Sequence, residues 1–74
     1  MLMAIWQDSI IKYMNENNLT NSEMIEEINR AGGEINKSGF SHWMRKPPRS
    51  RPSIKNSMAL EKILGKDYGI KFYS

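Results

Sequence analysis

The chain has 74 residues, 39% hydrophobic content and no cysteine, so we expect one small domain without disulfides or a thiolate metal site. It has no apolar run of membrane-spanning length and no basic leader before an apolar segment, which predicts a cytoplasmic protein with no membrane partner. The net charge of +3 is unevenly divided: residues 1–34 carry two basic against six acidic residues (−4), and residues 35–74 carry nine against two (+7). The second part therefore suits a polyanionic partner.

Two amphipathic helices are expected in the first part of the chain. Residues 5–15 have apolar residues at three-, four- and five-residue intervals: Ile5, Trp6, Ile10, Ile11 and Met14. The asparagines at positions 15, 17 and 18 tolerate a left-handed backbone and end this helix. Thr20 and Glu23 have the spacing of a capping box, which predicts the start of a second helix, and the glycines at 32 and 33 predict its end.

A basic loop separates two further expected helices. Asn36 is a suitable N-cap for a third helix whose inward residues are Phe40, Trp43 and Met44. Three prolines between positions 46 and 52 break this helix. Ser53 predicts the start of a fourth helix that ends at Leu64, with Ile54 and Met58 among its inward residues.

The last residues of the chain alternate loosely between apolar and polar side chains, which indicates a short strand or an extended arm. We expect an all-α domain of four to five short helices over residues 1–66, followed by a tail over residues 67–74. The apolar and aromatic residues of this tail are candidates for a dimer contact: Ile70, Phe72 and Tyr73.

Four short motifs occur in a defined order between residues 19 and 65. They are LT-x-x-E from Leu19, KS-x-x-S-x-W from Lys37, RPSI from Arg51 and LEKILG from Leu60. This order resembles the Cro/repressor-type (XRE-like) helix-turn-helix family of phage and bacterial regulators, which have a lambda repressor-like fold. Two features depart from the family pattern: about four additional residues between the second and third helices, and Gly39 within the third helix.

The resemblance implies a sequence-specific transcriptional regulator that binds double-stranded operator DNA, encoded by a phage or prophage and acting in a bacterial cell. We expect it to bind as a homodimer, because a lone domain with so few contacts would bind weakly. The resemblance places the third helix in the major groove. The implied base contacts lie at the start and on the outer face of that helix: Lys37, Ser38, Ser41 and His42. The implied phosphate contacts lie before and after it: Asn21, Ser22, Asn36, Arg45, Lys46, Arg49 and Arg51.

Two alternatives remain at this point. A protein-binding module with the same fold, such as an antirepressor or an antitoxin, would expose an apolar patch made by Trp6, Phe72 and Tyr73. A nonspecific nucleoid or RNA binder would show the charge pattern without sequence preference. No nucleophile with a base and no metal-ligand cluster can be assembled, since His42 is the only histidine, so we expect neither an enzyme nor a cofactor.

Overall fold

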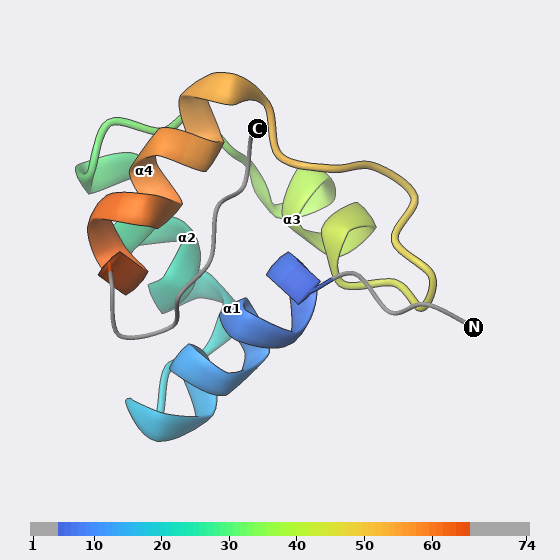
Figure 1. The fold of residues 1–74 in the computed structure, drawn as a ribbon, viewed down its shortest axis with the longest axis horizontal. Coiled ribbons are helices and arrows are strands. Elements are labelled where there is room, and N and C mark those ends of the chain that lie inside the picture. The colour runs from blue at the N-terminus through green and yellow to red at the C-terminus, as the bar shows by residue number, and fades with distance from the viewer. Residues whose placement is uncertain (1–4, 66–74) are drawn as a thin grey trace.

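The computed structural model describes residues 5–65, which form four helices and no strand (Figure 1). In chain order these are α1 (Ile5–Glu16), α2 (Asn21–Arg30), α3 (Lys37–Trp43) and α4 (Ile54–Leu64). The prediction of an all-α domain is therefore confirmed for this part of the chain. None of the helices in residues 5–65 is long and apolar enough to cross a membrane. The predicted tail with Ile70, Phe72 and Tyr73 lies outside the described residues.

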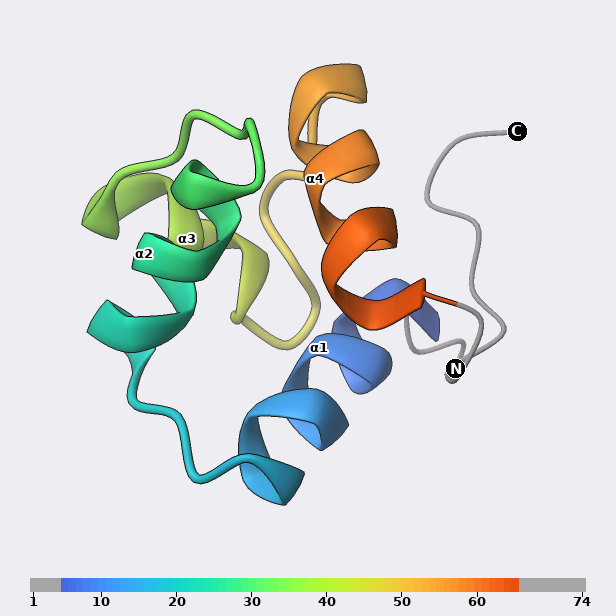
Figure 2. The ribbon, with the colours of Figure 1, turned by 90° about the vertical axis from the view of Figure 1, so that its left-hand side faces the viewer.

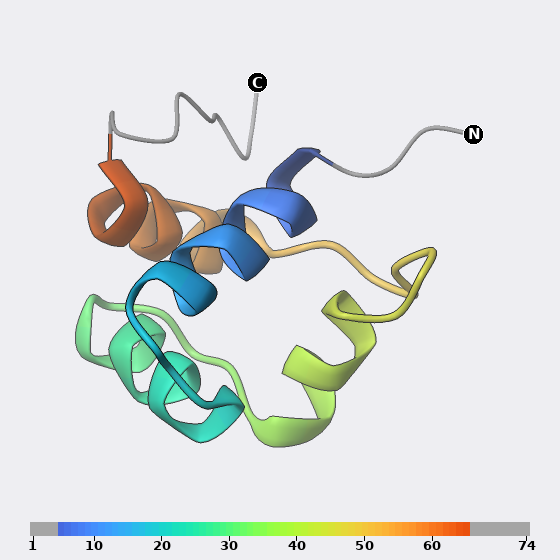
Figure 3. The same cartoon turned by 90° about the horizontal axis from the view of Figure 1, so that it is seen from below.

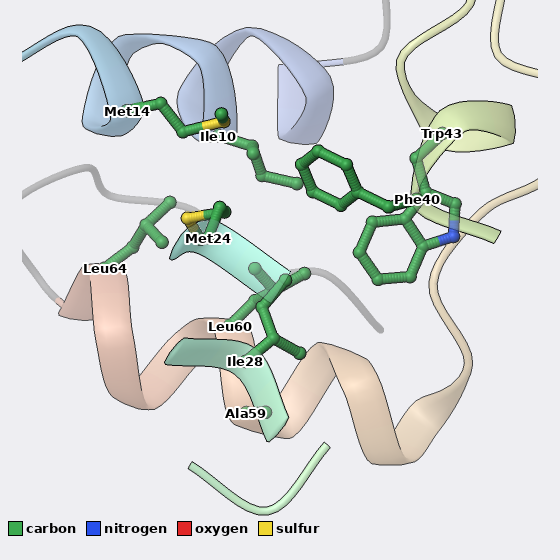
Figure 4. Close-up of a cluster of buried hydrophobic side chains, with 9 residues drawn as sticks. All are labelled: Ile10, Met14, Met24, Ile28, Phe40, Trp43, Ala59, Leu60 and Leu64. Atoms are coloured by element: carbon green, nitrogen blue, oxygen red, sulfur yellow. The ribbon is translucent and has the colours of Figure 1, made fainter. Parts of the chain in front are cut away.

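One hydrophobic core joins all four helices. Helix α2 packs against α3 and α4, and α1 packs against α4. Figure 2 shows α2 and α4 side by side, with α1 beneath them. Nine buried apolar residues form the core in Figure 4: Ile10, Met14, Met24, Ile28, Phe40, Trp43, Ala59, Leu60 and Leu64. Burial of each large side chain among them stabilises the fold by about 1.5–3 kcal/mol before conformational entropy is subtracted.

The predicted helix starts are confirmed by side-chain caps. Thr20 and Glu23 form the complete capping box: the Glu23 amide donates to Thr20 Oγ1 at 3.1 Å, and the Thr20 amide donates to Glu23 Oε1 at 2.8 Å. Asn36 and Ser53 each accept the amide of the third residue of their helix, at 2.8 and 3.2 Å. An N-cap of this kind contributes about 1 kcal/mol, so local sequence determines where α2, α3 and α4 begin.

The first two helices end in left-handed turns, as predicted. Asn18 has a φ of 53°, and the next amide, that of Leu19, donates to the Met14 carbonyl at 2.9 Å. Gly32 has a φ of 106°, and the amide after it donates to the Ile28 carbonyl at 2.9 Å. Both ends have the pairing of a Schellman motif, which satisfies carbonyls that the helix leaves open.

Helix α4 presents to the core only part of the face that was predicted: Ala59, Leu60 and Leu64 are buried as expected. Ile54 and Met58 are 69% and 50% exposed, so the prediction that they turn inward is wrong. Asn56 and Ser57 are buried in their place. The reason is polar: the Asn56 side chain bonds to the backbone between α2 and α3, and Ser57 Oγ donates to the Pro52 carbonyl at 3.5 Å. Leu60 and Leu64 then complete the apolar face.

The contact between α1 and α2 includes a hydrogen bond that depends on pH. The Tyr13 hydroxyl donates to Glu27 Oε1 at 2.9 Å. Burial, together with this bond and the charge of Glu27, raises the pKa of Tyr13 above its ordinary value of 10.0. Because the folded pKa is the higher one, the stabilisation is fully present below the unfolded pKa and is lost as pH rises through the folded pKa.

We therefore expect Tyr13→Phe to lower the free energy of unfolding by about 1 kcal/mol or less at neutral pH. The difference from the unsubstituted protein should shrink as pH rises above 10. Urea denaturation of both proteins at a series of pH values measures this difference. The lysines titrate in both proteins, so their effect on stability cancels in the comparison. A difference that is constant across the series would contradict the role given to this hydroxyl.

Candidate nucleic-acid interface

Helix α3 has one face in the core and one face in solvent. Phe40 and Trp43 are buried, at 1% and 2% exposure. The residues between and before them are exposed, since they lie on the other side of a 3.6-residue period: Lys37, Ser38, Ser41 and His42. Within residues 5–65 these four side chains make no hydrogen bond or ion pair. Their donors and acceptors are therefore available to a ligand.

A hollow of about 400 Å³ lies between the N-terminal half of α2 and the exposed face of α3. Its polar lining includes one predicted phosphate contact together with three predicted base contacts: Asn21, Lys37, Ser38 and Ser41. Its apolar lining is made by Ile25, Phe40 and Met44. The hollow thus brings residues from two helices onto one concave surface.

The basic loop over residues 44–53 continues from the C-terminal end of α3. Figures 1 and 3 show that it extends away from the four helices. Its cations are all exposed: Arg45, Lys46, Arg49 and Arg51. The loop backbone is nevertheless bound to α3 at one point, because the Arg49 amide donates to the His42 carbonyl at 2.9 Å. The loop that carries these four cations is therefore bound to the last turn of α3.

A buried glutamine from α1 binds backbone carbonyls at the C-terminal end of α3. Gln7 is 1% exposed, and its Nε2 donates to the Trp43 carbonyl at 2.7 Å and to the Arg45 carbonyl at 2.5 Å. Trp43 is a core residue, as predicted, and Trp6 packs against it edge to face, with ring centroids 6.4 Å apart. Trp6 is half-buried by this contact. It is therefore part of the support of α3.

Two asparagines bind the connection between α2 and α3, which comprises residues 31–36. Asn29 of α2 accepts the Ile35 amide at 2.9 Å and donates to the Ile35 carbonyl at 3.0 Å. Asn56 of α4 accepts the Glu34 amide at 2.6 Å and donates to the Glu34 carbonyl at 3.2 Å. The Glu34 carboxylate also forms an exposed ion pair with Lys55 at 3.1 Å. The additional residues between α2 and α3 are thus held in place.

Sequence reasoning missed Gln7, Asn29 and Asn56. For Asn29 and Asn56 the one signal is that asparagine is a poor helix former and yet occurs inside α2 and α4, and Gln7 has no such signal. Nothing in the local sequence indicates which distant carbonyl or amide such a side chain will reach. These residues can be found only from the packing of the helices.

All predicted DNA contacts are exposed, and they lie on neighbouring segments: the first turn of α2, the cap and outer face of α3, and the loop after it. The Asn36 side-chain oxygen is occupied by the cap of α3. No family model, curated protein or solved structure matches this chain. The functional assignment therefore depends on the chemistry of these residues.

The charge of the described residues is strongly segregated along the chain. Residues 35–65 carry seven basic residues against one acidic residue, Glu61, whereas residues 5–34 carry two against six. Among residues 5–65, no group of three histidine, cysteine, aspartate or glutamate side chains is placed to hold a metal ion. The arrangement suits recognition of an extended anion, which positive charge attracts and neutral donors and acceptors can read.

Proposed function

We propose that this protein is a sequence-specific DNA-binding transcriptional regulator of the helix-turn-helix type, with α3 in the major groove. The observation that supports this most is the combination on α3 of an exposed polar face without internal partners and a basic loop at its end. DNA binding needs both, because base edges require neutral and cationic donors and the backbone requires cations.

The dimensions of an α-helix agree with the proposal. With its side chains a helix is about 10–12 Å in diameter, which fits the major groove of about 12 Å width, and the seven residues of α3 extend over about 10 Å. Lys37 and Ser38 lie in its first turn, the part of a recognition helix that contacts base edges. In this docking lysine donates to the guanine O6 and N7 acceptors, and serine pairs with several bases.

Phosphate contacts are assigned to the segments on either side of α3. The loop supplies arginine and lysine side chains on a restrained backbone. On the other side, Asn21 and Ser22 lie in the first turn of α2, where the helix dipole and open amides favour a negative group. Together these contacts would fix the orientation of the domain on the duplex.

Binding as a homodimer to a palindromic operator is part of the proposal. A single domain of this size offers few contacts, and two copies on half-sites about one helical turn apart give higher affinity. The assignment to Cro/repressor-type phage or prophage regulators is supported by the ordered motifs alone.

Selection of bound duplexes from a random DNA pool tests the proposed function. The salt concentration should be about 150 mM, so that weak phosphate contacts are screened. We expect enrichment of a palindromic motif, and the spacing of its halves reports the dimer geometry. Absence of enrichment would overturn the proposal. Weak, sequence-independent binding would then favour the nonspecific binder, and no DNA binding would favour the protein-binding module.

Lys37→Ala is expected to relax the sequence preference. The affinity for the selected duplex should fall by roughly fivefold to a hundredfold, because a good base contact discriminates by about 1–3 kcal/mol. The affinity for random duplexes should fall only slightly. Lys62→Ala is the matched control, since it removes the same charge from the last turn of α4, which lies away from α3 (Figure 1). Equal losses on both kinds of duplex would contradict the assignment of Lys37 to base readout.

A further inference from the structure

The connection before α3 is held from both sides by side chains of other helices. Glu34 and Ile35 are consecutive residues, and each has its amide and its carbonyl bound by a single asparagine. Asn29 reaches Ile35 from α2, and Asn56 reaches Glu34 from α4. The backbone at these two residues is therefore positioned relative to both α2 and α4.

Two glycines leave room for this arrangement. A Cβ on Gly33 would lie 2.7 Å from Asn56 Oδ1 and 2.9 Å from the Ile28 carbonyl oxygen, so a side chain there would displace the connection. A Cβ on Gly39 would lie 2.7 Å from Ile35 Cδ1. Gly39 thus leaves room for the Ile35 side chain against the first turn of α3. Because Cδ1 is the end of a flexible side chain, which can shift, Gly33 is the more strictly required of the two glycines.

The constraint is transmitted directly to the proposed base contacts. Asn36 follows Glu34 and Ile35, the two residues whose backbone groups the asparagines bind. Its side-chain oxygen accepts the Gly39 amide and so caps α3. Lys37 and Ser38 are the next two residues, with no intervening turn to absorb a shift. Displacements beyond about 0.5 Å weaken a recognition geometry, because its hydrogen bonds require fixed distances and angles.

We propose that Asn29 and Asn56 are positioning residues that determine sequence specificity without touching DNA. They set the place at which α3 begins, and with it the position of Lys37 and Ser38 relative to the bases. This inference rests on the proposed function. In this inference, the longer connection between α2 and α3 contributes to recognition of the DNA sequence.

Asn29→Ala is the principal test, because Asn29 is exposed and its replacement leaves the core intact. The quantity measured is the ratio of the affinity for the selected duplex to that for a random duplex, well below the unfolding midpoint of each variant. We expect the ratio to fall by about tenfold, since a displaced base contact loses its discrimination. The affinity for the random duplex should change by less than about twofold, because the phosphate contacts remain.

Asn56→Leu, which keeps the number of side-chain heavy atoms and removes both hydrogen bonds to Glu34, should lower the ratio in the same direction. Glu34→Gln is the matched control: it removes the ion pair with Lys55 and keeps both clamped backbone groups, so its ratio should equal that of the unsubstituted protein. Hydrogen exchange gives an independent readout, in which the Ile35 amide loses protection in Asn29→Ala.

The outcomes separate the two proposals. An unsubstituted protein that enriches a motif, with an Asn29→Ala variant that loses Ile35 protection but keeps the ratio, would overturn the positioning role alone. A purely structural role would lower the melting temperature and leave the ratio unchanged. Absence of any preferred motif for the unsubstituted protein would overturn the proposed function and this inference together.

Discussion

Replacing Gln7 by leucine is expected to lower the free energy of unfolding by about 2–3 kcal/mol. The substitution keeps the side-chain volume nearly constant, so the cost comes from polar groups and not from a cavity. Nε2 of Gln7 satisfies the carbonyls of Trp43 and Arg45 at once, and each carbonyl that loses its partner in a buried site costs about 1–3 kcal/mol. The Arg45 carbonyl is partly accessible to water, so the combined cost is lower than for two fully buried carbonyls.

This effect is large for a domain of 74 residues, whose total stability is expected to be about 4–11 kcal/mol. Thermal and urea denaturation, followed by tryptophan fluorescence, measure the change. Asn15→Leu is the matched control, because it replaces an exposed amide on the same helix and should change stability by less than about 0.5 kcal/mol. A Gln7→Leu variant as stable as this control would show that the two carbonyls do not depend on the glutamine.

The double substitution Arg45→Ala and Arg49→Ala is expected to weaken binding to every duplex by about tenfold or more. Both side chains are exposed in the loop beside α3, so their removal leaves the fold unchanged. Each lost phosphate contact reduces the slope of log affinity against log salt by about 0.9, and the pair therefore reduces it by about 1.8. The order of preference among sequences should be kept, because phosphate contacts carry no base information.

A matched control for this loss is the double substitution Arg30→Ala and Lys62→Ala. It removes the same charge from the last turns of α2 and α4, which lie on the opposite side of the molecule from the loop (Figure 1). Its salt slope should stay close to that of the unsubstituted protein. If both pairs reduced affinity and slope equally, net charge and not the loop would account for binding. Titrations at several salt concentrations distinguish these results.

The helix boundaries could be predicted from the sequence because the interactions that set them are local. The capping box of Thr20 and Glu23 and the N-caps Asn36 and Ser53 each join groups three residues apart. The left-handed turns at Asn18 and Gly32 likewise depend on the residue at one position. The exposed face of α3 follows from its helical period, as do the buried Phe40 and Trp43 that oppose it.

The predicted face of α4 was wrong at Ile54 and Met58, because apolar residues at helical spacing do not by themselves decide which face is buried. Ile54 and Met58 satisfy that spacing and are exposed. The burial of Asn56 is decided by backbone groups of Glu34, 22 positions earlier in the chain, whose amide and carbonyl need a partner. A buried polar group must be paired, and this requirement outweighs the burial of two apolar side chains.

The sequence by itself therefore determined the four helices of residues 5–65, their caps and ends, the separation of charge, and the polar residues that α3 exposes. Only the tertiary structure decided how α3 is held: Gln7 of α1 binds the backbone at its end, and Asn29 of α2 and Asn56 of α4 bind the backbone before it. The physical reason is the range of the interactions. Caps and helical periods act within one turn, whereas these amides reach groups between 6 and 38 residues away, which only the packed helices bring within hydrogen-bond distance.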